Sequence, residues 1–259
     1  MNKNRKNNSR IHSQHEERIV VGLHASREVI KVRPGKVTQV WLKQGAERSQ
    51  DLKFFLDFAQ KQSRQVKLVF KSDRALDDIA ASHQGVCLMV AETPELDLTE
   101  VAGDTNEKVT LLALDEVSDP HNVGAMLRTA WLLGFKGLMV TENRSAHLTP
   151  AATKVASGGA EHVPIHVSSN LANDINYLKD KGFWVYGLTG KSATDLSSTR
   201  FNDKVIIVVG SEDRGLRSTT LNVCDEKLSI PQIDKDASFN ASVASAIAMY
   251  EVSRQHKNP

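Results

Sequence analysis

Two short polar segments near the end of the chain contain the residue types best suited to ligand chemistry. Residues 210–215 read Gly-Ser-Glu-Asp-Arg-Gly, and residues 237–242 read Ala-Ser-Phe-Asn-Ala-Ser. The first segment follows an unbroken apolar run at residues 205–209, which is typical of a strand buried on both faces of a parallel sheet. Ligands collect at the carboxyl ends of such strands, where glycine allows close approach. The alternative, a turn and a helix that serve only as scaffold, stays open at this point.

Arg128 is the second candidate, because it is the single charged residue of an otherwise apolar predicted helix at residues 123–135. A buried guanidinium without a partner would be strongly destabilising, so this side chain must reach a cleft or meet an anion. Asp119 and Pro120 are typical of the start of that helix. We therefore favour a functional role for Arg128 over a structural ion pair.

The elements that must position these residues alternate between strands and helices. The pattern predicts strands at residues 109–114, 137–141, 163–167, 183–188, 205–209 and 227–230, with helices at 123–135, 150–156, 171–181 and 241–252. Such alternation is the signature of a doubly wound α/β domain with a parallel sheet. A smaller α/β unit precedes it, with predicted strands at 38–43, 65–70 and 85–91 and helices at 25–32, 48–62 and 75–80.

Composition shifts divide the chain into four parts: residues 1–18, 19–91, 92–107 and 108–259. The first part has five basic and two acidic residues and little to bury, which predicts a flexible arm that touches RNA phosphates or a tail that is merely solvated. The third part has six acidic residues and no Lys or Arg, which predicts a solvated linker.

Composition also excludes several classes of protein. The chain has 259 residues, a net charge of +2 and 40% hydrophobic residues, as an ordinary globular protein does. Its apolar runs are too short to span a membrane and its start is polar, so we expect a cytoplasmic protein. Cys87 and Cys224 lack metal-ligand spacing, which predicts buried thiols and no metal. The glycine patterns of dinucleotide and P-loop sites and the serine elbow of hydrolases are missing from the sequence.

Three segments, taken together, resemble one family. Residues 119–130, 210–216 and 230–244 are similar, in that order, to the three motifs of the TrmH-type RNA ribose 2′-O-methyltransferases of the SPOUT superfamily, and the turn at 156–160 also matches. Residues 19–91 resemble the L30e-like RNA-binding module that precedes the catalytic domain in bacterial 23S rRNA guanosine 2′-O-methyltransferases.

The resemblance implies a fold and a cofactor. It implies a SPOUT domain whose last part is tied into a trefoil knot, and loops that converge on S-adenosylmethionine. The positions that match the cofactor-contacting residues of the family are Gly210, Ile230, Phe239, Thr189 and Ser211. The family more often has Leu where this chain has Phe239.

The resemblance also implies a catalytic set: Arg128, Asn122, Glu212, Ser238 and Asn240. Arg128 would approach the target ribose, either as the base or, in the interpretation that we prefer, by orienting the phosphate and stabilising the developing alkoxide. Asn122 and Glu212 would hold Arg128 and the ribose, while Ser238 and Asn240 would fix the knot loop. Ser238 could also be a helix N-cap.

The implied function is methylation of a ribose 2′-OH in RNA with S-adenosylmethionine, and guanosine in 23S rRNA is the favoured substrate. Two alternatives remain: a tRNA ribose 2′-O-methyltransferase, and a non-catalytic RNA-binding factor for ribosome assembly with the same fold. Related enzymes are homodimers whose active site forms across the subunit boundary, so we also expect a homodimer.

Overall fold

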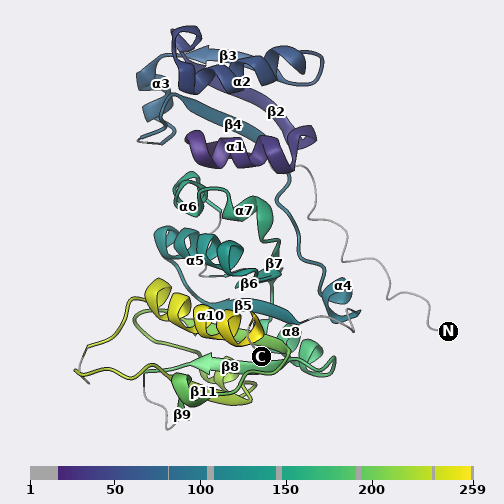
Figure 1. The fold of residues 1–259 in the computed structure, drawn as a ribbon, viewed down its shortest axis with the longest axis vertical. Helices are drawn as coiled ribbons and strands as arrows, with labels where there is room; N and C mark the ends of the chain where they lie inside the picture. The colour runs from purple at the N-terminus through teal and green to yellow at the C-terminus, as the bar shows by residue number, and fades with distance from the viewer. Residues whose placement is uncertain are drawn as a thin grey trace, which may run out of the picture.

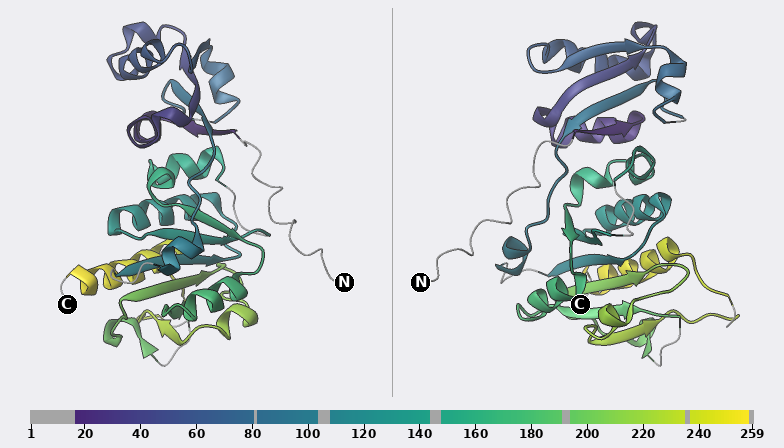
Figure 2. Two further views of the ribbon diagram at one scale, coloured as in Figure 1. Left: turned by 90° about the vertical axis from the view of Figure 1, so that its right-hand side faces the viewer. Right: turned by 180° about the vertical axis from the view of Figure 1, so that it is seen from behind.

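The computed structural model describes residues 17–80, 82–103, 108–143, 148–190, 194–234 and 237–257. These residues form two sheets, each with its own helices and hydrophobic core (Figure 1). We call residues 17–91 the first domain and residues 108–257 the second domain. The first domain lies at one end of the second in every view (Figure 2). Residues 1–16 of the predicted arm lie outside the described residues.

The first domain is a four-stranded mixed sheet in the order β1-β4-β2-β3. Its elements are β1 (Glu17–Val21), α1 (Leu23–Val32), β2 (Val37–Lys43), α2 (Gln50–Lys61), β3 (Lys67–Lys71), α3 (Asp73–Asp77) and β4 (Val86–Ala91), with 3₁₀ turns at Pro34–Lys36 and Ala46–Arg48. Helix α2 buries Leu52, Phe55 and Ala59 against the sheet, as its apolar spacing predicts.

Strand β1 corrects the predicted boundary of the arm. Composition predicted that residues 17 and 18 belong to the flexible arm, but they pair with Ala91 and Val90 of β4, and Arg18 is buried. Composition could not predict this strand, because residues 17 and 18 adopt it only by pairing with β4, which is distant in the sequence. The arm prediction is therefore wrong for Glu17 and Arg18.

The acidic segment between the domains is less solvated than its charge predicts. Helix α4 (Leu98–Gly103) forms within it, and Leu96, Leu98 and Ala102 are buried in the core of the second domain. Residues 104–107 of the predicted linker lie outside the described residues. The prediction of a solvated linker is wrong for Leu96, Leu98 and Ala102, because these three apolar residues pack against the sheet of the second domain.

The second domain contains a seven-stranded sheet in which every pairing between strands is parallel. Its strands are β5 (Val109–Asp115), β6 (Gly137–Thr141), β7 (Ile165–Ser168), β8 (Trp184–Leu188), β9 (Thr194–Asp195), β10 (Lys204–Gly210) and β11 (Glu226–Ser229), in the order β7-β6-β5-β10-β8-β11-β9. Every residue of β5 is buried, as is all of β10 after Lys204. The prediction of strands covered on both faces is confirmed.

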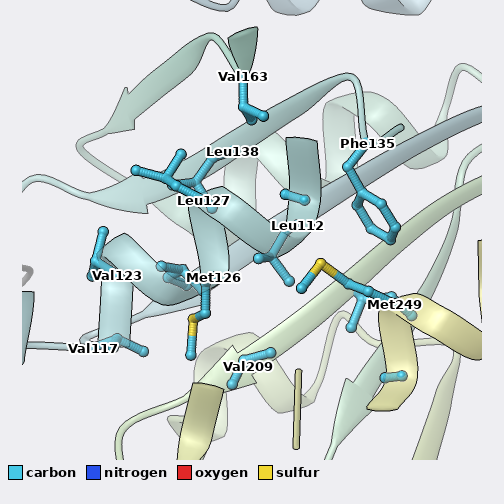
Figure 3. Packing of buried hydrophobic residues seen from close by; sticks show 14 of the residues in the cluster. Leu112, Val117, Val123, Met126, Leu127, Phe135, Leu138, Val163, Val209 and Met249 are labelled. Carbon is cyan, nitrogen blue, oxygen red and sulfur yellow. The ribbon is translucent and has the colours of Figure 1, made fainter. Parts of the chain in front are cut away.

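Helices cover both faces of this sheet, which confirms the doubly wound α/β fold. Helices α5 (Pro120–Leu133), α6 (Pro150–Ala156), α7 (Gly159–His162) and α10 (Ala241–Lys257) belong to one side, and α8 (Leu171–Lys179) and α9 (Ser218–Leu221) to the other, with a 3₁₀ turn at Leu196–Ser198. In the core, Met126 and Leu127 of α5 and Met249 of α10 pack on Leu112 of β5 (Figure 3). Asp119 caps α5 by accepting a hydrogen bond from the His121 N–H, and Pro120 is its first residue, as predicted.

The strand order places three strand ends side by side. Strand β10 lies between β5 and β8, and β8 in turn pairs with β11, although these strands are far apart in the sequence. The segments that follow β8, β10 and β11 therefore start from neighbouring positions at one edge of the sheet. The trefoil knot stays a prediction.

Candidate active site

A single carboxylate joins three polar segments of the second domain. Glu212 Oε1 accepts a hydrogen bond from Asn122 Nδ2 at 2.9 Å and another from Asn240 Nδ2 at 2.5 Å. The backbone N–H of Ala241 also points to this oxygen, at 3.4 Å. Asn122 is buried at the start of α5, whereas Glu212 and Asn240 are exposed. The structure thus brings together three of the five predicted catalytic residues in one polar cluster, which we call the Glu212 cluster.

Asn240 has a second contact that fixes its position. Its Oδ1 accepts hydrogen bonds from the Ser242 N–H at 2.8 Å and the Ser242 hydroxyl at 2.6 Å, so Asn240 caps helix α10. The helix begins at Ala241, and the suggestion that Ser238 is its N-cap is wrong. Ser238 and Phe239 are exposed beside the cluster, and among the described residues no hydrogen bond joins Ser238 to it.

Arg128 lies apart from the Glu212 cluster. Its guanidinium is exposed, and Nη1 donates to the Ser157 hydroxyl at 3.4 Å. Asn122 and Arg128 are six positions apart on α5, which separates them by about 9 Å along the helix axis and about 120° around it. The expectation that Asn122 and Glu212 hold Arg128 is therefore not met within one chain. Arg128 instead shares the outer face of α5 with Leu132, whose side chain is 62% exposed.

Four of the five residues predicted to contact the cofactor lie at the three neighbouring strand ends, whereas Phe239 lies just before α10. Gly210 ends β10 and is buried; a Cβ there would lie 2.1 Å from the Gly215 carbonyl carbon, so only glycine fits. The turn closes through a hydrogen bond from the Gly215 N–H to the Ser211 backbone oxygen at 2.8 Å. Ile230 follows β11 and packs half-buried against the main core.

Thr189 follows β8, and its side chain can bind a further group. Its N–H donates to the Leu228 oxygen at 2.9 Å, but its buried hydroxyl has no hydrogen-bond partner among the described residues. A buried hydroxyl without a partner costs roughly 1–3 kcal/mol, so such groups usually bind a ligand or a water molecule. The position of Thr189 between the ends of β8 and β11 fits a bound cofactor.

Sequence reasoning missed an anchoring ion pair behind the glycine turn. Asp115 is fully buried at the end of β5, and its carboxylate accepts from Arg217 Nε at 2.6 Å and from the Arg217 N–H at 2.9 Å. Arg217 also lies 3.5 Å from a carboxylate oxygen of Glu116. The contact ties the turn at residues 211–217 to the neighbouring strand. An acidic residue directly after a buried strand is the sequence signal that could have found it.

The described part of the chain contains no group of three or more side chains placed to hold a metal ion. None of its helices is long and apolar enough to cross a membrane. Both cysteines are free thiols: Cys87 is buried, as predicted, whereas Cys224 is half-buried. Burial raises the pKa of the Cys87 thiol and of the Cys224 thiol to about 12, so neither is a ready thiolate nucleophile near neutral pH.

Comparison with protein families assigns both domains. Residues 109–250 match the SpoU rRNA methylase family, and residues 19–96 match the family described as RNA 2′-O ribose methyltransferase substrate binding. The boundary between the two matches falls in the acidic segment that contains α4.

Relatives match over nearly the whole chain. A protein of Staphylococcus aureus named as a TrmH family tRNA/rRNA methyltransferase is 37% identical over 93% of this chain and 97% of its own length. The 23S rRNA (guanosine-2′-O-)-methyltransferase RlmB of Shewanella oneidensis is 35% identical over 93% of this chain and 98% of its own length.

Solved structures share the fold. The SpoU methyltransferase AviRb from Streptomyces viridochromogenes, in complex with AdoMet, has a TM-score of 0.80 at 19% identity, covering 93% of this chain and 91% of its own. A structure concerned with 2′-OH methylation of C/U34 on tRNA has a TM-score of 0.52 at 26% identity, and it covers 59% of this chain and 99% of its own.

Proposed function

The chain belongs to the SpoU family of RNA ribose 2′-O-methyltransferases, the TrmH type of the SPOUT superfamily, and from that premise we propose that it methylates the 2′-OH of a guanosine in 23S rRNA. One observation carries the choice of substrate. The relative named for this reaction is 35% identical over both domains, including the substrate-binding domain that precedes the catalytic one. Ribosomal RNA as the substrate agrees with the predicted cytoplasmic location.

S-adenosylmethionine is the methyl donor and supplies an electrophilic methyl group when bound. Thr189, Gly210, Ser211, Ile230 and Phe239 hold it in this proposal. The support is local: the first four lie at adjacent strand ends, and the Thr189 hydroxyl has no hydrogen-bond partner among the described residues. Gly210 lets the turn at 211–215 fold back closely, which exposes backbone groups to a ligand instead of a side chain.

The chain's own residues make the ribose oxygen competent. A guanidinium keeps its proton at physiological pH, so Arg128 binds the phosphate beside the target ribose and stabilises the charge that develops on the 2′-oxygen. The oxygen would give its proton to that phosphate or to water as it takes the methyl group, and the bond between that methyl group and the donor's sulfonium sulfur would break to leave a neutral thioether. The Glu212 cluster fixes the starts of α5 and α10 against the glycine turn, and it orients the ribose.

A second copy of the chain completes this site in our proposal. Among the described residues no hydrogen bond joins Arg128 to the Glu212 cluster of its own chain, so in this proposal the two halves meet at one ribose across a subunit boundary. The outer faces of α5 and α10 carry apolar side chains that suit such a contact: Leu132, Val243 and Tyr250 are 62%, 45% and 60% exposed. The proposal is a homodimer formed through these faces.

Two other functions remain to be separated by experiment. A tRNA substrate is supported by the relatives named for tRNA and rRNA together, but the tRNA-related structure matches 59% of this chain, which is little more than the second domain. A non-catalytic assembly factor would have no need for the hydrogen-bonded Glu212 cluster or for an exposed Arg128.

The experiment is a map of 2′-O-methyl groups in rRNA and tRNA from cells with and without the protein. We expect one methylated guanosine of 23S rRNA to lose its methyl group, and a gene encoding wild type, but not Arg128→Ala, to restore it. Loss from tRNA alone would support the tRNA alternative. A defect in ribosome assembly with every methyl group intact would support the non-catalytic factor.

A further inference from the structure

A buried ionic contact joins the two domains. Glu161 of α7 is 2% exposed, and its two carboxylate oxygens bind two arginines of the first domain. Arg18 of β1 donates to one oxygen, and Arg33, which follows α1, donates to the other from 3.3 Å. The arginine side chains are 9% and 15% exposed. The contact therefore lies in the interior, between the first domain and a short helix of the second.

The next residue links the same helix to α5. His162 Nε2 lies 3.1 Å from Glu28 Oε2 of α1, and its ring stacks on the Trp131 ring with a centroid separation of 4.2 Å and an angle of 7°. Trp131 is three residues after Arg128 on α5. Helix α7 is thus held by the first domain on one side and by α5 on the other, and Figure 1 shows α6 and α7 between α1 and α5.

The turn that leads into α7 holds Arg128 directly. A Cβ on Gly159 would lie 2.8 Å from the Leu127 oxygen and 3.0 Å from the Arg128 Cα, so the turn and α5 touch backbone to backbone. Ser157, which accepts a hydrogen bond from the guanidinium, has a left-handed backbone with φ of 51°. Ser157 is the C-cap of α6, and its N–H donates to the Lys154 oxygen, so this conformation ends the helix next to Arg128. The first domain packs closely against the next residue of this turn, since a Cβ on Gly158 would lie 2.5 Å from Glu28 Cγ.

We do not expect the ionic contact to contribute much to the free energy of folding. Two arginines face one carboxylate, and Arg18 Nε and Nη1 are buried without partners among the described residues. Buried charges with unmet donors are often no better for stability than apolar side chains of similar size. What such a contact does provide is a defined relative position of the groups that it joins.

We propose that Glu161, Arg18 and Arg33 are positioning residues for methyl transfer, which lock the substrate-binding domain onto the turn at residues 157–159 and thereby fix Arg128. The RNA that the first domain holds and the arginine that acts on the ribose then keep a fixed position relative to each other. The inference rests on the proposed role of Arg128. It adds a role for the domain interface: the first domain orients the catalytic arginine as well as holding RNA.

The test compares Glu161→Gln and Arg33→Gln with Lys179→Gln, a control that removes a cation from the pair with Asp225 on the far side of the sheet. Full-length proteins are assayed for single-turnover methyl transfer at saturating 23S rRNA fragment and S-adenosylmethionine, and for the Kd of each. We expect the two interface variants to lose about 10- to 100-fold in rate, since small misplacements of catalytic groups have effects of this size. Both Kd values should stay within about twofold of wild type, which identifies a loss in the reacting complex. Lys179→Gln should keep the wild-type rate.

Arg33→Lys keeps the test sharp if Glu161→Gln fails to fold. Lysine keeps the positive charge but lacks the forked pair of nitrogens of the guanidinium. The methyl-transfer rate of Arg33→Lys should therefore lie between those of Arg33→Gln and wild type. Full single-turnover rates in folded interface variants would overturn the proposal, and so would a loss confined to RNA affinity. If wild type itself leaves 23S rRNA unmethylated, the proposed substrate is wrong; if Arg128→Ala is fully active, the premise about that arginine is wrong.

Discussion

The proposed site combines an exposed cation, Arg128, with a hydrogen-bonded carboxylate, Glu212. Glu212 Oε1 receives the amides of Asn122 and Asn240 and the first N–H of α10, so its role is to hold the site together. Among the described residues, Arg128 has one hydrogen bond, a long one to Ser157, and its exposed guanidinium is free to bind an RNA phosphate in the proposed reaction. The two residues should therefore respond differently to substitution.

Arg128→Ala should lower the rate of methyl transfer by about 100-fold or more, since removal of one group that stabilises developing charge has effects of this order. The Kd for S-adenosylmethionine should not change, because among the described residues no hydrogen bond joins Arg128 to the predicted cofactor positions. Single-turnover assays and calorimetry measure the two quantities. Arg128→Lys should recover only part of the rate, because lysine cannot bind a phosphate through two parallel hydrogen bonds. Full activity of Arg128→Ala would contradict the assignment.

At the scale of single residues, the sequence predicted which residues belong to the polar cluster better than it predicted their contacts. The motifs led to Asn122, Glu212 and Asn240, which do meet. The resemblance also implied that Asn122 and Glu212 hold Arg128, but among the described residues Arg128 bonds to Ser157 instead. The difference arises because helical geometry puts residues 122 and 128 on different faces. Arg18, Arg33 and Glu161 escaped notice because their pairing depends on how two domains dock, and no local pattern encodes that.

Among the helices and strands, the start of α10 and the end of β10 carry the residues of the proposed site. The parallel strands and most helices were predictable, because continuous apolar runs and helical spacing are local signals. Strand β1, the short helix α4 and the pairing of β10 between β5 and β8 were not, because each depends on contacts distant in sequence.

Asn240→Ala should lower the free energy of unfolding by about 1 kcal/mol, because α10 loses its N-cap. Asn240→Ser should keep the cap and a near-wild-type Tm, yet it should lose activity, because serine cannot bridge to Glu212 in the same way. Thermal melts and methyl-transfer assays on the two variants separate the capping role from the role in the site. Equal activity of wild type and Asn240→Ser would assign Asn240 to capping alone.

Gly210→Ala should abolish or strongly weaken binding of S-adenosylmethionine, because its Cβ would overlap the Gly215 backbone and the turn would have to move. Calorimetric titration with the cofactor measures this. Gly35→Ala is the matched control, since a Cβ there meets no atom within 4 Å. Cofactor binding that survives in Gly210→Ala would separate this turn from the cofactor site.

At the scale of the whole molecule, our proposal has the substrate-binding domain hold the RNA while the ionic contact between the domains fixes Arg128. A partner subunit then completes the site. The homodimer predicts that Tyr250→Glu and Leu132→Glu shift the protein to monomers and reduce methyl transfer, because charges would be buried in the proposed contact. Light scattering with size-exclusion chromatography measures the mass. Phe54→Glu, which alters a side chain 40% exposed on α2, is the control and should not change it. A wild-type monomer with full activity would contradict the proposed dimer.

Removal of residues 1–16 should weaken RNA binding and flatten its salt dependence. For each phosphate that the shortened chain no longer binds, the slope of log K against log salt should fall by about 0.9 or less. The truncation must end before Arg18, because that residue belongs to the domain interface. Titrations at several salt concentrations measure the slope, and a chain with Gln at positions 3, 5, 6 and 10 keeps the length as a control. An unchanged slope would leave the arm a solvated tail.

The fate of labelled methyl groups decides most directly whether this chain methylates a guanosine ribose of 23S rRNA. Purified protein is incubated with methyl-labelled S-adenosylmethionine and total RNA from cells that lack the protein, and the digested RNA fractions are analysed by mass spectrometry. We expect label in 2′-O-methylguanosine from 23S rRNA, and none when Arg128→Ala replaces wild type. Label on a base, or label found only in tRNA, would contradict the proposed function.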